Sequence, residues 1–374
     1  MKQQYFKTLT WLRAVAAFFV VVSHSIRTSE VQYGANDEAS YFFPLSLLDL
    51  GTFGVYLFFA LSGCTLFISS HEKINSIGDF APFYMKRFMR IWPAFAISLV
   101  IYLLFIEVFR HFYQLDHKFW IAQFLREYSF TNILQYLSLT FNITGPKGLF
   151  IGPYWSLPIE FQYYLLLPFA ILLMNIKKLD FITPVFFGGL LYFFHKYEIF
   201  QVESTRIFSM AFVFFGGVLL GKIHQTISFK FSFKESIFIF SLFVLFVGLI
   251  RTSIVSIPEY IPFISQKNNL YGIMAILSVG LSLLTNAPKK QNKIFDFIQE
   301  YGTISYSIYL FHMLFVGIAA LLVINLEIYG DSPKLFFVLS FSLIGSYIFS
   351  KYSYRYLEEP FIKIGRNFAN IRKV

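Results

Sequence analysis

Two ionisable residues stand inside the first apolar stretch of the sequence. Arg13 and His24 are eleven residues apart, which corresponds to about 16 Å along an α-helix. Because eleven steps of about 100° make close to three full turns, both side chains are expected on one face of that helix. An ionisable group in a membrane helix is costly, so each is a functional hypothesis by default. The alternatives are a snorkelling arginine at one membrane surface and an interfacial histidine at the other.

A pair of arginines opens a later apolar stretch. Arg87 and Arg90 stand at positions i and i+3 of the segment 86–93, so they share a helix face. Two guanidinium groups side by side suit a diphosphate, because each is a planar and permanently charged fork. A basic cluster that binds anionic lipid headgroups would look the same in sequence.

Two carboxylates complete the set of candidate reactive groups. Glu160 lies one turn inside an apolar stretch, where it should pair with an arginine, a histidine or a hydroxyl, or face a wet cavity. Asp49 precedes another such stretch, on the same predicted side as His24. A carboxylate that holds one imidazole nitrogen leaves the other as a general base. The alternative for Asp49 is an exposed position in a loop. The alternative for Glu160 is a purely structural pairing.

Other residues carry weaker signals. Trp155 suits either a substrate site or an interfacial belt, and His312 is interpreted as a core histidine. Cys64 is the single cysteine, which excludes an intrachain disulfide and a cysteine-based metal site. Phosphate-binding loops, dinucleotide fingerprints, His-x-x-x-His pairs and Gly-x-Ser-x-Gly elbows are absent from the sequence. No metal cofactor is expected.

The elements that must position these residues are membrane helices. Of the 374 residues, 56% are hydrophobic, 21% are aromatic and 14% are charged, and the mean hydropathy is +0.60. This composition excludes a cytosolic enzyme, a disordered protein and a disulfide-rich secreted domain. We predict an all-α, polytopic membrane protein with about ten spanning helices in a single domain over residues 1–374. The predicted spans are Thr8–Ile26, Leu50–Ser70, Ile91–Ile106, Trp155–Ile176, Phe181–Phe194, Ile207–Gly221, Ser236–Ile250, Asn268–Pro288, Tyr301–Leu326 and Leu335–Ser350.

The basic residues are concentrated in the loops on one side of the membrane. The formal net charge is +10, which on its own would suggest a nucleic-acid partner. With the N-terminus placed in the cytoplasm, Lys and Arg on the inside outnumber those on the outside about two to one. The bias explains the charge without nucleic acid, and it predicts that both termini are cytoplasmic.

Six segments of the sequence carry a common pattern, and they are Arg13 to His24 with its ten-residue spacing, Gly54–Gly63, Arg87–Pro93, Pro153–Phe161, Ile304–His312 and Arg355–Phe361. Together they resemble the acyltransferase-3 family of integral membrane acyltransferases, and the likeness covers about residues 5–365. One departure is Tyr56, which stands where the family often has an acidic residue.

The resemblance implies transfer of an acyl group, usually acetyl, from cytoplasmic acetyl-CoA to a hydroxyl of an extracytoplasmic carbohydrate. The protein would lie in the inner (plasma) membrane of a bacterium, and no appended soluble domain is expected. Arg13, Arg87 and Arg90 would bind the donor. His24 would be the general base or a transient acyl carrier, with Asp49 and Glu160 as further catalytic candidates. The remaining assignments place two residues at the substrate site, Trp155 and Glu358.

A transporter is the alternative function. Ten helices with inward polar groups and many aromatic residues would also suit a flippase that moves a glycan or an acyl-bearing intermediate across the bilayer. The two functions differ in whether a thioester is consumed.

Overall fold

The computed structural model describes residues 2–29, 47–112, 124–144, 151–197, 206–224, 226–253, 265–288 and 292–371, together with positions 255 and 263. Over these residues the chain is built from helices, without a β-strand. The α-helices are α1 (Lys2–Thr28), α3 (Gly51–Ser70), α4 (Phe80–Phe112), α5 (Phe130–Leu137), α6 (Phe141–Thr144), α7 (Ser156–Met174), α8 (Ile182–Lys196), α9 (Arg206–Ser209), α10 (Ala211–Ile223), α11 (Phe233–Arg251), α12 (Lys267–Leu283), α13 (Lys293–Thr303), α14 (Ser305–Asn325), α15 (Asp331–Ser353) and α16 (Glu359–Ile371). Short 3-10 turns include η4 (Gly152–Trp155), and a π-helical turn, η5 (Tyr354–Glu358), joins α15 to α16.

Helices account for most of every predicted spanning segment, which confirms the all-α polytopic fold. Among the described residues, seven helical stretches are long and apolar enough to cross a membrane. Helices α8, α10 and α12 have 15, 13 and 17 residues, which is short for a core of about 30 Å. The predicted segment Tyr301–Leu326 is divided at Ile304 between α13 and α14. The seven stretches are Phe6–Thr28, Gly51–Lys73, Ile77–Phe112, Gly152–Met174, Phe233–Arg251, Ser305–Asn325 and Asp331–Phe368.

Large apolar side chains cover the outer faces of the peripheral helices. Leu104 on α4, Phe169 on α7, Phe238 on α11 and Phe336 on α15 are all more than half exposed. In water such a surface would aggregate, whereas lipid tails solvate it without cost. The buried polar residues of the helices, such as Ser278, His312 and Ser342, face other helices and not this surface.

Helix α3 is the centre of the bundle, and small residues let its neighbours approach closely. A Cβ atom on Gly54 would lie 2.6 Å from the carbonyl oxygen of Ala16 in α1. On another face of α3, a Cβ on Gly63 would collide with the backbone of Phe214 in α10. Only glycine fits at such backbone contacts, as is common where membrane helices cross. The close approach fixes α1, which carries Arg13 and His24, against α3.

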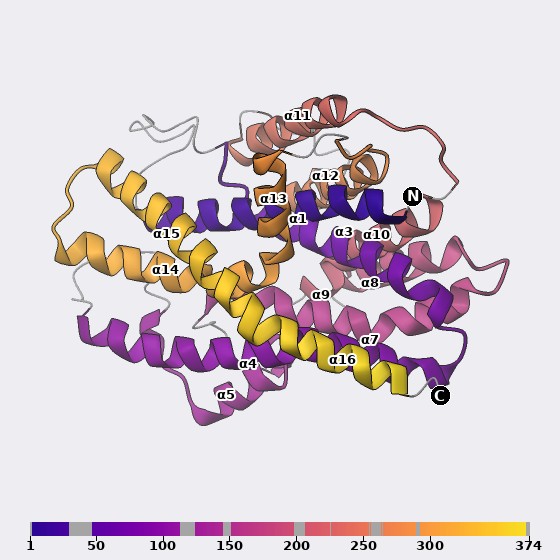
Figure 1. Ribbon diagram of the computed structural model, residues 1–374, viewed down its shortest axis with the longest axis horizontal. Helices are drawn as coiled ribbons and strands as arrows, with labels where there is room; N and C mark the ends of the chain where they lie inside the picture. The colour runs from indigo at the N-terminus through magenta and orange to yellow at the C-terminus, as the bar shows by residue number, and fades with distance from the viewer. Residues whose placement is uncertain are drawn as a thin grey trace.

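The two ends of the described chain lie toward the same side of the molecule. Figure 1 shows the start of α1 and the end of α16 at the right of the view. The α15, η5 and α16 segments run as one long ribbon across the front, and α16 packs against α4. This path brings the C-terminal helix to the part of α4 that carries the paired arginines.

Candidate active site

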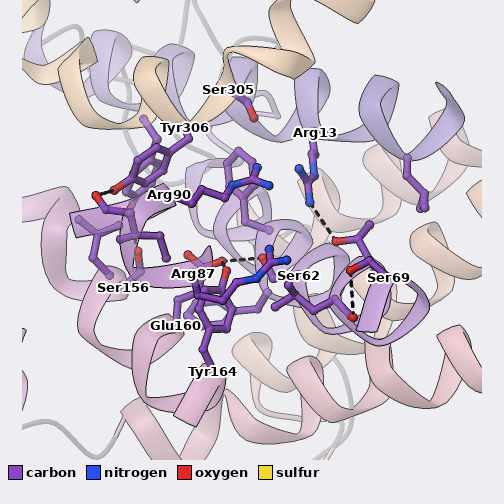
Figure 2. Close-up of a pocket in the computed structure, with 18 of the residues that line it drawn as sticks. Arg13, Ser62, Ser69, Arg87, Arg90, Ser156, Glu160, Tyr164, Ser305 and Tyr306 are labelled. Atoms are coloured by element: carbon purple, nitrogen blue, oxygen red, sulfur yellow. Dashed lines mark hydrogen bonds between the residues drawn. The ribbon is translucent and has the colours of Figure 1, made fainter. Parts of the chain in front are cut away.

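A cavity of about 380 Å³ opens between six helices, and we call it the arginine cavity. Arg13 enters it from α1, Arg87 and Arg90 from α4, Glu160 from α7 and Arg366 from α16. Figure 2 shows the guanidinium groups of the first three arginines directed into the same space. The i, i+3 pair on α4 therefore shares a face, as the sequence predicts. The remaining lining residues are Phe6, Leu9, Thr10, Val55, Phe58, Phe59, Ser62, Thr65, Leu66, Ser69, Ile91, Ser156, Leu157, Tyr164, Ser305, Tyr306 and Tyr309.

The arginine cavity carries an excess of positive charge. Within the part of the chain that the structure describes, none of its four arginines forms an ion pair with a carboxylate. Arg13 donates to Thr65 Oγ1 at 2.9 Å. The Nε atom of Arg87 is buried and has no hydrogen-bond partner, while its guanidinium lies 5.7 Å from the centre of the Phe83 ring. Arg13, Arg87 and Arg90 are only partly exposed. Cations withdrawn from water without counterions are unfavourable, so this arrangement favours a polyanionic ligand.

Glu160 is satisfied by hydroxyl groups. Its Oε1 atom accepts a hydrogen bond from Ser62 Oγ at 2.6 Å and another from the Tyr164 hydroxyl. The sequence predicts an arginine, histidine or hydroxyl partner, and the structure selects the hydroxyl. Among the lining residues of the arginine cavity, Glu160 is the one that carries a carboxyl group.

A second cavity, of about 360 Å³, lies further along α1, and we call it the histidine cavity. It contains His24 and Trp155, so two of the predicted site residues meet there. Tyr56, the departure from the family pattern, also lines it. The wall combines aromatic rings with hydroxyl, amide and guanidinium groups. Its other members are Val20, Ser23, Arg27, Gly51, Thr52, Val55, Gly152, Pro153, Ser209, Met210, Asn268 and Tyr309.

The two cavities share two lining residues, Val55 and Tyr309. The Tyr309 hydroxyl donates to the carbonyl oxygen of Pro153 and lies 2.7 Å from Ser156 Oγ. These bonds anchor the side chain between α14 and the start of α7. Arg13 and His24 thus line adjoining cavities from one helix, as their spacing predicts.

His24 pairs with another histidine. Its Nδ1 atom lies 2.7 Å from Nε2 of His312 in α14, which is fully buried. From the sequence, His312 is predicted to be a core histidine, and its contact with His24 is not predicted. The signal was available, because His312 is an ionisable residue inside a spanning helix and lies in a quoted family segment.

Asp49 takes part in a buried ion cluster, which corrects its expected roles as an exposed loop residue or as the partner of His24. Its side chain has no exposed surface, and it pairs with Arg27 at 3.1 Å and Arg251 at 2.9 Å. Ser23 Oγ also donates to it. Both carboxylate oxygens are therefore engaged by guanidinium groups. The role that these contacts support is tying α1, the start of α3 and α11 together.

The position of Glu358 differs from the predicted one, which was at the substrate site. It is 1% exposed, and its Oε2 atom accepts from Ser307 Oγ at 3.0 Å. It is not among the lining residues of the arginine or the histidine cavity. It sits in the π-helical turn η5, a distortion that is frequent near functional sites. Its position supports the walls of the site and not direct contact with a substrate.

Comparison with known proteins decides the family. The model of the acyltransferase-3 family, described as an acyltransferase domain, matches residues 6–351. This chain belongs to the acyltransferase-3 family. No curated protein and no solved structure was found that matches it.

The family makes the protein a membrane acyltransferase. The match includes Arg13, Arg87 and Arg90 and the two histidines, His24 and His312. It ends at residue 351, so Glu358 and Arg366 lie beyond it. An acyltransferase-3 site in this chain is therefore expected at the adjoining arginine and histidine cavities.

Proposed function

We propose that this protein transfers an acyl group, most simply acetyl, from acyl-CoA to a hydroxyl of a carbohydrate outside the cytoplasm of a bacterium. The observation that carries the proposal is the contact of the two cavities at Val55 and Tyr309. One cavity offers unpaired arginines and the other offers a histidine. An anionic thioester and a neutral alcohol need these two different environments.

The arginine cavity supports an acyl-CoA donor. The diphosphate would be held by Arg13, Arg87 and Arg90, because guanidinium groups bind phosphate oxygens in pairs. A further cavity of about 450 Å³ adjoins it and shares Ser69, Arg87 and Arg366. That cavity adds two lysines, Lys73 and Lys86. Its charge and size suit the nucleotide end of the donor, and the acyl arm would then point toward Tyr309.

The histidine cavity supports a carbohydrate acceptor. Sugars present hydroxyl groups at their edges and C–H groups on their faces, so their sites combine polar side chains with aromatic rings. Trp155 and Tyr56 supply rings, while Thr52 and Asn268 supply polar groups. The acceptor hydroxyl would reach the His24 ring in this cavity.

The chemistry needs one base and no redox step. The His24 Nε2 lone pair takes the proton of the acceptor hydroxyl as its oxygen bonds to the thioester carbonyl carbon. When the tetrahedral intermediate collapses, the carbon–sulfur bond breaks and the same proton goes to sulfur, giving an ester and a free thiol. A positioned base of this kind contributes about 10²–10⁴-fold. Transient acylation of His24 itself is the alternative route.

A transfer assay tests the function. Purified protein in detergent is supplied with [¹⁴C]acetyl-CoA and washed envelopes of the native cell, and released thiol is compared with label bound to glycan. We expect one thiol for each acetyl group transferred, and loss of both in His24→Ala at an unchanged level of folded protein. Glycan transport across liposomes without thioester consumption would refute the proposal and establish the flippase.

A further inference from the structure

We propose that His312 is a positioning residue that selects the reactive tautomer of His24. The inference rests on the proposed function, because it concerns the base that the transfer requires. The observation behind it is a chain of three polar groups inside the bundle: His24, His312 and the backbone carbonyl of Tyr309.

The far end of the chain fixes the proton on His312. Its Nδ1 atom lies 2.8 Å from the carbonyl oxygen of Tyr309 and 3.2 Å from that of Ile308. A carbonyl oxygen only accepts hydrogen bonds, so Nδ1 of His312 must carry the hydrogen. In a neutral imidazole the other nitrogen, Nε2, then has the lone pair.

The tautomer of His312 determines the tautomer of His24. Because Nε2 of His312 accepts, Nδ1 of His24 must donate across the 2.7 Å contact. His24 therefore has its own lone pair on Nε2. A base in this mechanism needs that tautomer, since a hydrogen on Nε2 would leave it nothing with which to accept the hydroxyl proton.

The geometry of the two rings suits this role. Their planes are within 6° of each other and their centres are 5.0 Å apart. Face-to-face rings could not bring two nitrogen atoms to 2.7 Å, so the rings lie edge to edge with the hydrogen bond in their common plane. That is the direction in which an imidazole N–H donates. The contact therefore sets both the tautomer and the orientation of the His24 ring.

The burial of His312 indicates why it stays in place. It is fully buried in α14, and the neighbouring Tyr309 ring is anchored to Ser156 at 2.7 Å. A side chain locked by packing and by backbone hydrogen bonds can hold a reactive group to the tolerance that catalysis requires. His312 acts through His24 and not on the substrate.

Two substitutions of similar size separate positioning from packing. His312→Gln keeps an acceptor where Nε2 stood, while His312→Leu fills the space without one. In the envelope assay we expect kcat of His312→Leu to fall by at least about tenfold, up to the roughly 10²–10⁴-fold that a positioned base supplies. His312→Gln should recover a substantial part, and the KM for acetyl-CoA should be unchanged in both.

His224→Ala is the matched control. His224 is also buried, and its Nδ1 atom lies 2.7 Å from the carbonyl oxygen three residues earlier, of Gly221, as in His312. The kcat of the His224→Ala variant should equal that of the wild type. Equal rates in His312→Leu and His312→Gln, or wild-type rates in both, would overturn the inference. An inactive wild-type protein would instead refute the proposed function.

A measurement on the unaltered chain covers the case in which the His312 variants do not fold. Nitrogen NMR of protein labelled with [¹⁵N]histidine reports which ring nitrogen carries hydrogen. His24→Ala identifies the His24 signals by difference. We expect the Nδ1–H form at His24, and an Nε2–H signal would contradict the inference.

Discussion

Replacing Arg87 by glutamine should weaken donor binding and leave the acceptor site intact. The guanidinium lines the arginine cavity, and its Nε atom is buried without a hydrogen-bond partner. A hydrogen bond to a charged group contributes about 1.5–3 kcal/mol. Since about 1.4 kcal/mol is tenfold in affinity, the Kd for CoA should rise about 10- to 150-fold. Arg87→Lys should lie between the two, because lysine keeps the charge and loses the fork.

The assay is calorimetric titration of CoA into detergent-purified protein. Arg110→Gln is the control, because Arg110 lies near the other end of α4 and pairs with Glu107 at 2.9 Å. Its Kd should match the wild type, and thermal unfolding should show that both variants are folded. An unchanged Kd in folded Arg87→Gln would refute a donor role for this cavity. Equal weakening in both variants would indicate a general effect of charge.

Three further substitutions test the framework that holds the site. Gly54→Ala places a Cβ 2.6 Å from a backbone oxygen of α1 and should lower the free energy of unfolding by about 1–3 kcal/mol. Gly189→Ala is the control and should not destabilise the protein, because no atom lies within 4 Å of the added Cβ. Equal denaturation midpoints for the two variants would contradict the close packing at Gly54. Asp49→Asn leaves two arginines without their carboxylate and should lower the free energy of unfolding by about 1–3 kcal/mol. Asp180→Asn, at a partly exposed ion pair, should lower it by less than about 1 kcal/mol. Urea unfolding of the two variants measures this difference. Ser62→Ala removes a hydroxyl donor from Glu160 and should destabilise the fold by about 1–3 kcal/mol, which lowers the melting temperature. An unchanged melting temperature would show that this hydrogen bond does not contribute to stability.

Much of the bundle could be predicted from composition and helical periodicity. Apolar stretches locate the spanning helices because lipid imposes both their length and their internal hydrogen bonding. Helical periodicity also places Arg87 and Arg90 in one cavity, and Arg13 and His24 at adjoining cavities. Each of these pairs lies within one helix, so the spacing in the sequence is enough to predict it.

Contacts between distant segments could not be predicted in this way. His24 and His312 are 288 residues apart, and Asp49 and Arg251 are 202 apart. Which helices adjoin depends on packing at glycines such as Gly54, where a missing Cβ admits a neighbouring backbone. The sequence locates the ionisable groups and leaves their partners open. The partners of Asp49 are left open in this way, and in the structure they are Arg27 and Arg251.

We propose that the acyl group passes from a donor in the arginine cavity to an acceptor in the histidine cavity, and so from one side of the membrane to the other. The direct test uses proteoliposomes of known orientation, with [¹⁴C]acetyl-CoA added outside and extracted envelope glycans enclosed in the lumen. We predict labelled glycan in the lumen only where the protein termini face outward, and none with His24→Ala. Label on glycan supplied to the same side as the thioester, with none in the lumen, would contradict the claim.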